Sequence, residues 1–341
     1  MQFTPPNSQK KQRIEFIDLA KGVCILLVVL GHCGVIIPIP GFNMMRMPLY
    51  FILSGLFFKD YGGFLEHSLK KINKILVPFL FFYVIAYIPF YIFEYWKPGL
   101  IKTSATGLLD LFNNRNFFNG PIWFLLTLFW ANLMFCLISL NIKSEYGRGL
   151  VTILIGLVGL ILGKSEIFLP LFLDVAMSAL PYFYIGYILN KTPILYPNKY
   201  DRYNLLIALG AYLVAYAITV FCNEPHMSFH YNKMYGNVFL NYIGSFTCVI
   251  AILFVCKIIK HLPVVSYCGR YSIILLCLHH MIYRPVILGV NKLGLTDQRA
   301  AWVTAIVTIT ICIGMIPVCK KLIPWFVAQK DLIKSPVKNK R

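Results

Sequence analysis

Apolar runs of membrane-spanning length recur along this 341-residue chain, and they constrain its fold more than any other feature. A helix needs roughly 20 apolar residues to cross about 30 Å of bilayer hydrocarbon. Hydrophobic residues make up 58% of the chain and charged residues only 13%, so a soluble domain of this size cannot bury its apolar surface. The sequence therefore predicts an all-α, polytopic bundle of transmembrane helices.

We expect ten spans. The first follows the basic residues Lys10, Lys11 and Arg13, as a signal peptide would. However, the charged residues Asp18 and Lys21 interrupt its start, and no small-residue cleavage site follows. We therefore expect an uncleaved span rather than a signal peptide. The expected spans are 17–37, 47–58, 75–95, 121–140, 150–168, 170–190, 203–222, 238–256, 271–290 and 301–323. The chain divides into an N-terminal tail (1–16), a membrane domain (17–323) and a basic C-terminal tail (324–341).

The lysines and arginines are distributed unevenly between the alternate connecting segments. Of the 32, we assign 23 to the segments on one side, termini included, and 9 to the other. Because basic residues concentrate in cytoplasmic loops, both termini are expected in the cytoplasm, in an inner or plasma membrane. The same pattern explains the net charge of +19 without a nucleic-acid partner. The sequence gives no indication of the oligomeric state.

Three polar residues share one face of the first span. At 100° per residue, Asp18, Lys21 and His32 fall within an arc of about 60°. Lys21 and His32 are eleven residues apart, a rise of roughly 16 Å, so His32 is expected near the middle of the membrane or just beyond it. One interpretation is an interfacial ion pair and a structural histidine. The other is a polar seam ending in an imidazole that accepts a proton near neutral pH.

A second histidine site lies in the ninth span. His279 is nine residues, about 13 Å, beyond Arg270, so it can reach the depth of His32. His280 points about 100° away from it, and only one of the pair can face a given site squarely. The alternative to a shared site is a structural histidine. We keep His279 as a candidate catalytic residue with His32 and Asp18.

Basic residues cluster just before the third span, at Lys70, Lys71 and Lys74. Positive-inside anchoring explains such a cluster. The functional interpretation is a phosphate-binding site for a cytosolic coenzyme, because lysine binds phosphate as a point charge.

Other polar or aromatic residues carry weaker signals. Ser54, beside Gly55, predicts close helix packing and a hydroxyl bonded across helices. Trp123 is either part of the interfacial aromatic belt or a stacking platform for a sugar ring. Asp174 is either paired within the bundle or functional. His226 and His230 lack an evident third ligand, so no metal site is expected.

These motifs occur together in a known order. The chain resembles the acyltransferase-three family of integral membrane acyltransferases, most closely its fucose 4-O-acetylase-like branch. The resemblance covers nearly the whole chain and is carried by the segments 17–32 (IDLAKGVCILLVVLGH), 47–55 (MPLYFILSG), 71–79 (KINKILVPF), 122–125 (IWFL), 181–187 (PYFYIGY) and 269–279 (GRYSIILLCLH).

The resemblance implies ten helices, a cytosolic acyl-CoA donor such as acetyl-CoA as co-substrate, no bound cofactor, and a glycan or glycolipid acceptor. His32 would be the catalytic histidine. Lys21, Lys71 and Lys74, with Lys70 beside them, would bind the donor, although many members have arginine at the first three. Where many relatives read Phe-His-Met-Pro, this chain has Met45-Arg46-Met47-Pro48. Arg46 is therefore a candidate acceptor-binding residue, together with Trp123 and Ser54.

The resemblance implies a membrane O-acyltransferase, with O-acetylation of an exported polysaccharide as the expected reaction. His32 acts either as a general base or as an acyl-histidine relay. The main alternative is a proton-coupled transporter or flippase for a glycan, which predicts internal repeats that the sequence does not have. A scaffold without chemistry gives no reason for two intramembrane histidines and a phosphate-binding cluster to coexist.

Overall fold

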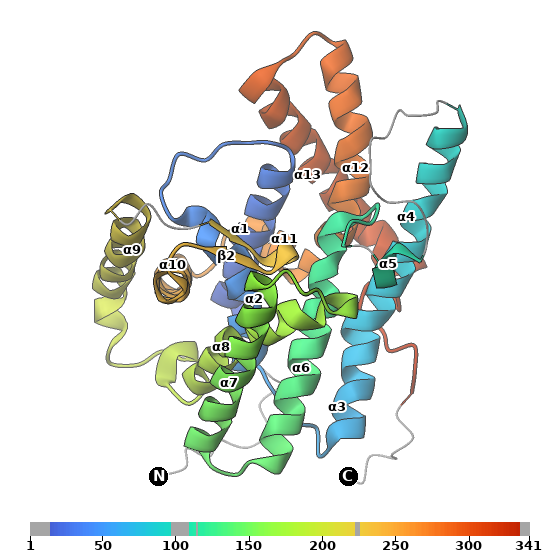
Figure 1. Cartoon of the computed structure of the whole chain (residues 1–341). Helices are drawn as coiled ribbons and strands as arrows, with labels where there is room; N and C mark the ends of the chain where they lie inside the picture. Colours follow the sequence, from blue (N-terminus) through green and yellow to red (C-terminus); the bar gives the residue numbers. More distant parts are fainter. Residues whose placement is uncertain (1–13, 97–108, 114, 222–225, 335–341) are drawn as a thin grey trace.

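The computed structural model describes residues 14–96, 109–113, 115–221 and 226–334. Its helices form one bundle (Figure 1). The α-helices are α1 (Glu15–His32), α2 (Arg46–Leu56), α3 (Phe64–Lys71), α4 (Val77–Trp96), α5 (Asp110–Asn113), α6 (Trp123–Asn141), α7 (Glu145–Lys164), α8 (Leu173–Leu189), α9 (Asn204–Phe221), α10 (Val238–Ile259), α11 (Pro263–Arg270), α12 (Ser272–Lys292) and α13 (Asp297–Leu322).

Short elements connect these helices. A π-helix, η2 (Ile72–Leu76), joins α3 to α4. The 3₁₀ turns are η1 (Phe42–Met45), η3 (Gly120–Ile122), η4 (Pro170–Phe172), η5 (Pro193–Leu195), η6 (Asp201–Tyr203) and η7 (Phe229–Tyr231). Between α9 and α10, β1 (His226–Ser228) pairs antiparallel with β2 (Lys233–Tyr235). The all-α prediction is confirmed, with this hairpin as the one small addition in the described part of the chain.

Each of the ten expected spans coincides with a helix. Eight helical stretches in the described residues are long and apolar enough to cross a bilayer, and they correspond to the last eight expected spans. The first two expected spans form α1, which carries Glu15, Asp18 and Lys21, and α2, which is only 11 residues long. The chain is thus a multi-pass membrane protein, whereas the count of ten and the orientation of its ends stay predictions.

Helix α1 ends earlier than expected. The first span was predicted to reach residue 37, but the helix stops at His32, and Gly34 follows with a φ of +82°. Glycine adopts this left-handed conformation without steric cost. His32 therefore lies in the last turn of α1, where the chain leaves the helix, rather than within a continuous span.

Ion pairs connect helix ends that the predicted alternation places on the same side. The side expected to be cytoplasmic has Glu145–Lys191 (2.6 Å), Asp201–Lys257 (2.7 Å), Glu15–Arg270 (3.5 Å) and Asp331–Lys70 (2.9 Å). The opposite side has Asp174–Arg115 (2.5 Å) and Glu166–Lys233 (2.6 Å). These contacts agree with helices that run alternately up and down.

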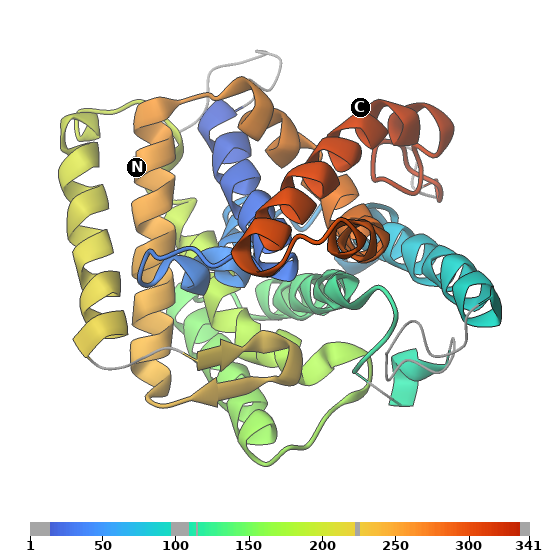
Figure 2. The same ribbon diagram turned by 90° about the horizontal axis from the view of Figure 1, so that it is seen from above.

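Helix α1 lies inside the bundle, with α9 and α10 side by side at one edge and α4 at the opposite edge (Figures 1 and 2). Two glycine pairs allow the central helices to approach closely. A Cβ on Gly55 of α2 would lie 1.8 Å from the Phe183 carbonyl oxygen, and one on Gly186 of α8 would lie 1.8 Å from that of Ile52. Such contacts between small residues are typical of helix packing in membranes.

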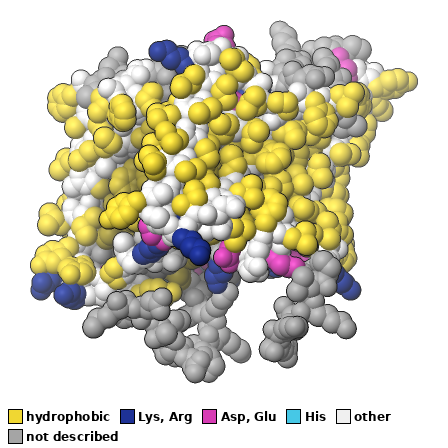
Figure 3. Space-filling view, turned by 60° about the horizontal axis from the view of Figure 1, so that its bottom comes forward, with side chains coloured by type: hydrophobic (Ala, Val, Ile, Leu, Met, Phe, Trp, Pro, Cys, Tyr) yellow, Lys and Arg dark blue, Asp and Glu magenta, His cyan; other side chains and the backbone are white. Residues whose placement is uncertain are grey.

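The pair Gly22 and Gly269 plays the same role between α1 and α11. A Cβ on Gly22 would lie 1.9 Å from the Val265 carbonyl oxygen, and one on Gly269 would lie 1.8 Å from that of Asp18. The glycines in these sequence motifs therefore fix the position of α1. The face of the bundle seen in Figure 3 is apolar over a broad belt, with charged side chains gathered mainly along its edges.

Candidate active site

A cavity of about 870 Å³ opens beside the C-terminal end of α1. Its walls come from the last turn of α1, residues 37–48, the start of α6, the end of α9, residues 228–230 and α12. Apart from the α12 residue Leu276, these are helix ends and loops expected on the non-cytoplasmic side. The cavity is large enough for a small-molecule ligand.

His32 lines this cavity and is exposed to it. Its ring centroid lies 5.2 Å from that of His279 and 5.9 Å from that of His280, both on α12. No hydrogen bond to another described residue engages the His32 ring, which lines the cavity beside these two rings. The two histidine sites predicted on separate spans therefore meet.

His279 lies behind His32 rather than in the cavity. It is fully buried, and its Nδ1 donates a hydrogen bond to the Leu275 carbonyl oxygen at 2.8 Å when the ring is neutral. Its Nε2 is buried without a hydrogen-bond partner among the described residues. This geometry places His279 against the His32 ring and outside the cavity lining. It does not give His279 the direct contact with acceptor or oxyanion that the sequence suggested.

Arg46 lies on the cavity wall next to His32. Its guanidinium rests over Gly31, where a Cβ would come within 2.5 Å of Nη1, and Nη2 donates to the Asn43 side-chain oxygen. The predicted acceptor-side residue Arg46 thus faces the same space as His32.

Trp123 and His230 form another part of the wall. Trp123 is only 8% exposed, and its ring lies 5.5 Å from that of His230 and 5.7 Å from that of Phe172. Trp123 is therefore buried at the cavity and does not lie in a lipid-facing belt. Its role in stacking on a sugar stays a prediction.

A buried ion pair holds His230 in place. Asp174 is fully buried and pairs with Arg115 at 2.5 Å, and Asn232 donates to the same carboxylate oxygen at 3.0 Å. Arg115 Nη1 in turn donates to the His230 carbonyl oxygen at 2.7 Å. Of the two interpretations of Asp174, the structure supports pairing within the bundle.

On the expected donor side, α1 carries Asp18 and Lys21. Asp18 is 6% exposed and lies 4.0 Å from the Arg270 Nε, and the ammonium of Lys21 lies 6.0 Å from the Phe57 ring centroid. Asp18 is remote from the cavity lining. Its contact with Arg270 supports a role in fixing α1 against α11 rather than in catalysis.

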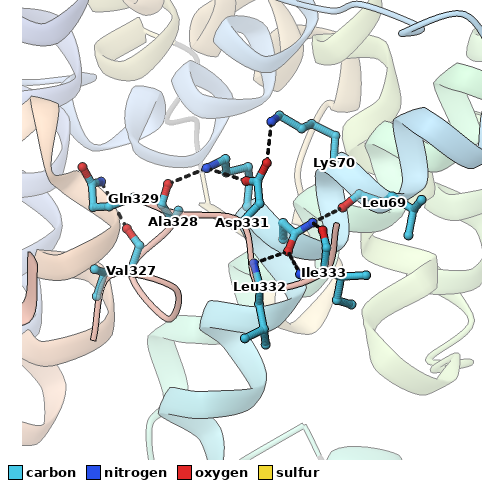
Figure 4. A network of polar contacts seen from close by, with 10 residues as sticks. Leu69, Lys70, Val327, Ala328, Gln329, Asp331, Leu332 and Ile333 are labelled. Carbon is cyan, nitrogen blue, oxygen red and sulfur yellow. Dashed lines mark hydrogen bonds and ion pairs between the residues drawn. The ribbon is translucent and has the colours of Figure 1, made fainter. Parts of the chain in front are cut away.

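The C-terminal segment covers two of the expected donor lysines (Figure 4). Asp331 pairs with Lys70 and Lys74, each at 2.9 Å, and Lys74 also donates to the Ala328 carbonyl oxygen. Asn73 holds the same segment through the backbone N–H groups of Leu332 and Ile333, at 2.8 Å each. Residues 323–334 are therefore packed on α3 and η2, and the predicted tail has a docked first part.

Lys71 points elsewhere. A helix places it about 100° from Lys70, whereas Lys70 and Lys74, four residues apart, share a face. Lys71 is half-buried and has no ion pair with any residue that the structure describes. The four predicted donor lysines thus separate into a pair held by Asp331 and the inward-facing Lys71, with Lys21 on α1.

A model of the acyltransferase domain of the acyltransferase-three family matches residues 14–319. The chain belongs to the acyltransferase-three family. Curated proteins and solved structures gave no match. Membership in this acyltransferase family assigns acyl transfer as the general activity, and the matched region contains the cavity, both histidine sites and all four lysines.

Ser54 was expected to bind the acceptor, but the structure places it outside the cavity. Its hydroxyl accepts a hydrogen bond from Asn132 Nδ2 at 3.0 Å, between α2 and α6, and it does not line the cavity. The cross-helix bond predicted for it is present, but the geometry gives no contact with an acceptor.

Sequence reasoning missed the role of His230. The sequence suggested for it only a role as a metal ligand, whereas it lines the same cavity as His32. Burial lowers the pKa of His230 below its usual value, and the nearby Arg115 charge adds to this, against the opposing effect of the hydrogen bond to the Arg115 backbone. Arg115 was a sequence signal for this contact, because a charged residue in an outer segment needs hydrogen-bond partners, and one of them is the His230 carbonyl oxygen.

Docking of the C-terminal segment is expected to depend on pH. Hydrogen bonds from Lys70 and Lys74 hold the pKa of Asp331 below its ordinary value. A lowered carboxyl pKa stabilises the docked state above the pKa of the free group, about 4, and this contribution is lost as the pH falls through the lower value. Hydrogen exchange should show Leu332 and Ile333 protected at neutral pH and losing protection in acid.

The matched variants are Asp331→Asn and Lys330→Gln. Asp331→Asn should remove the ion pairs, weaken protection at neutral pH and abolish its acid dependence, whereas Lys330→Gln should behave like the unmodified chain. Equal protection in Asp331→Asn and the unmodified chain at neutral pH would show that Asn73 alone holds the segment.

Proposed function

We propose that this protein is an O-acyltransferase that moves an acetyl group from cytosolic acetyl-CoA to a hydroxyl of an exported or cell-surface glycan or glycolipid. The observation that carries the proposal is the placement of His32. It lies on the wall of a cavity at one end of α1, and the donor-side lysines lie toward the other end. We place the protein in the inner or plasma membrane, in the fucose 4-O-acetylase-like branch of the family.

In the proposed reaction, the acceptor hydroxyl enters the cavity and donates its proton to His32. The oxygen attacks the thioester carbonyl, and the tetrahedral intermediate collapses as the carbon–sulfur bond breaks. The histidinium then returns its proton to the leaving thiolate, so an ester and free CoA are formed. General base catalysis of this kind typically contributes about 10²–10⁴-fold to the rate.

The contacts of His279 support its part in this scheme. Because its Nδ1–H is committed to the Leu275 carbonyl oxygen, the buried Nε2 carries a lone pair near the His32 ring. The His279 ring thus packs against His32 and limits how it can rotate. His279 acts on the substrate only through His32.

The deciding experiment uses purified full-length protein in nanodiscs with acetyl-labelled CoA. We expect saturable binding of acetyl-CoA, and transfer of label to surface glycan isolated from cells that lack this protein. Mass spectrometry of the glycan should identify the acetylated sugar. A glycan flippase predicts neither result, so absence of both binding and transfer in folded protein would refute the proposal.

A further inference from the structure

The acceptor cavity has an unbalanced charge. Among the described residues that line it, Arg46 is the only lysine, arginine, aspartate or glutamate. The neighbouring ion pair of Asp174 and Arg115 is already neutral as a unit, and burial lowers the pKa of His230. The cavity therefore presents one permanent positive charge.

The Arg46 guanidinium is only partly satisfied. Asn43 accepts one hydrogen bond from Nη2, and no carboxylate in the described part of the chain pairs with the group. Its Nε–H is buried without a hydrogen-bond partner among those residues. A guanidinium has five donors in a fixed fork that matches carboxylate and phosphate oxygens.

Gly31 brings this group to the reaction centre. Because a Cβ at Gly31 would come within 2.5 Å of Nη1, the glycine allows the guanidinium to lie against α1, one residue before His32. A ligand bound by the fork is thus held beside the imidazole that faces the same cavity.

We infer that the acceptor is an acidic glycan, whose carboxylate or phosphate binds Arg46 while a nearby hydroxyl faces His32. This inference rests on the proposed function and narrows its substrate class. The anionic group offsets the cost of a partly buried cation, and the fork fixes the orientation of the sugar. Trp123 and His230 then form the wall on which the sugar ring rests.

The test is binding rather than turnover. Saturation-transfer NMR with full-length protein in nanodiscs compares methyl glucuronide, glucose 6-phosphate and neutral methyl glucoside. Because hydrogen bonds to charged groups contribute about 1.5–3 kcal/mol, we expect at least one anionic probe to bind about tenfold or more tightly than the glucoside. Comparison of the two anions identifies carboxylate or phosphate as the preferred group.

Four variants locate the effect. Arg46→Gln should abolish the preference for the anion and leave binding of the glucoside and of acetyl-CoA unchanged. Arg46→Lys should retain part of it, and Gly31→Ala should weaken it by displacing the guanidinium without removing the charge. Thr219→Val, whose hydroxyl donates to the Ala215 carbonyl oxygen and not to the ligand-binding fork, should have no effect.

Equal binding of charged and neutral probes by the unmodified protein overturns the inference, as does a preference that survives in Arg46→Gln. These results are independent of acetyl transfer. If the protein transfers acetyl groups equally well to neutral and acidic acceptors, the proposed function stands and the inference fails. If it binds acidic sugars but not acetyl-CoA, the preference for acidic sugars stands and the proposed acetyl transfer fails.

Discussion

Replacing His32 by alanine is expected to lower kcat/KM for acetyl transfer by about 10²–10⁴-fold, the range typical for loss of a general base. The affinity for acetyl-CoA should be nearly unchanged, because His32 faces the cavity and lies roughly 16 Å along α1 from Lys21. Single-turnover transfer of labelled acetyl groups and separate binding of acetyl-CoA measure the two quantities.

His261→Ala is the matched control. His261 is an exposed histidine 3.8 Å from Glu15, outside the cavity lining, and its loss should change the rate less than about twofold. Activity of His32→Ala near that of the control, in protein that still binds acetyl-CoA, contradicts the proposed role. Intact-mass analysis with acetyl-CoA alone separates the two chemical routes, because only an acyl-histidine relay leaves an acetyl group on the protein.

The second large effect is expected at Lys71. We predict that Lys71→Gln raises KM for acetyl-CoA by about 10–100-fold, the loss expected for one hydrogen bond to a charged group, with little change in kcat. The reason is structural: Lys71 faces the bundle without an ion pair among the described residues, so its charge is available to a phosphate. Initial rates at varied acetyl-CoA concentration provide both constants.

Lys70→Gln is the control in the same helix. Lys70 already pairs with Asp331 at 2.9 Å on a partly exposed surface, so its loss should change KM by less than about fivefold. Equal effects of the two substitutions would assign the donor phosphates to the whole cluster. In that case Asp331→Asn should lower KM, because the C-terminal segment and the donor would compete for Lys70 and Lys74.

The length of the apolar runs predicted the main helices, and helix geometry indicated that the two histidine sites could lie at the same depth. The arc shared by Lys21 and His32 follows from 100° per residue, and depth counting placed His279 level with His32, where the ring centroids lie 5.2 Å apart. The helix boundary was less predictable. Apolar residues continue past Gly34, so composition alone does not reveal that α1 ends at His32.

Contacts between distant segments were not predictable from one sequence. Asp331 and Lys70 are 261 residues apart, and Arg115 and Asp174 are 59 apart, so no local period links them. Basic residues at helix ends also have a sufficient explanation in membrane orientation. For the same reason, the sequence did not distinguish Lys71 from its neighbours, and only the direction of each side chain separates them.

The position of α1 has a consequence for how such proteins diverge. Lys21 and His32 belong to one unbroken helix, which packs closely against α11 at Gly22. The length of this helix therefore sets the distance between the expected donor side at Lys21 and the cavity at His32. A substitution in α1 changes the contacts of one residue. A single-residue insertion between Lys21 and His32 rotates the rest of the helix by 100°, so that the imidazole no longer lies on the same face as the lysine. Across evolution, the length of this segment should therefore be more strictly retained than the identity of most residues within it.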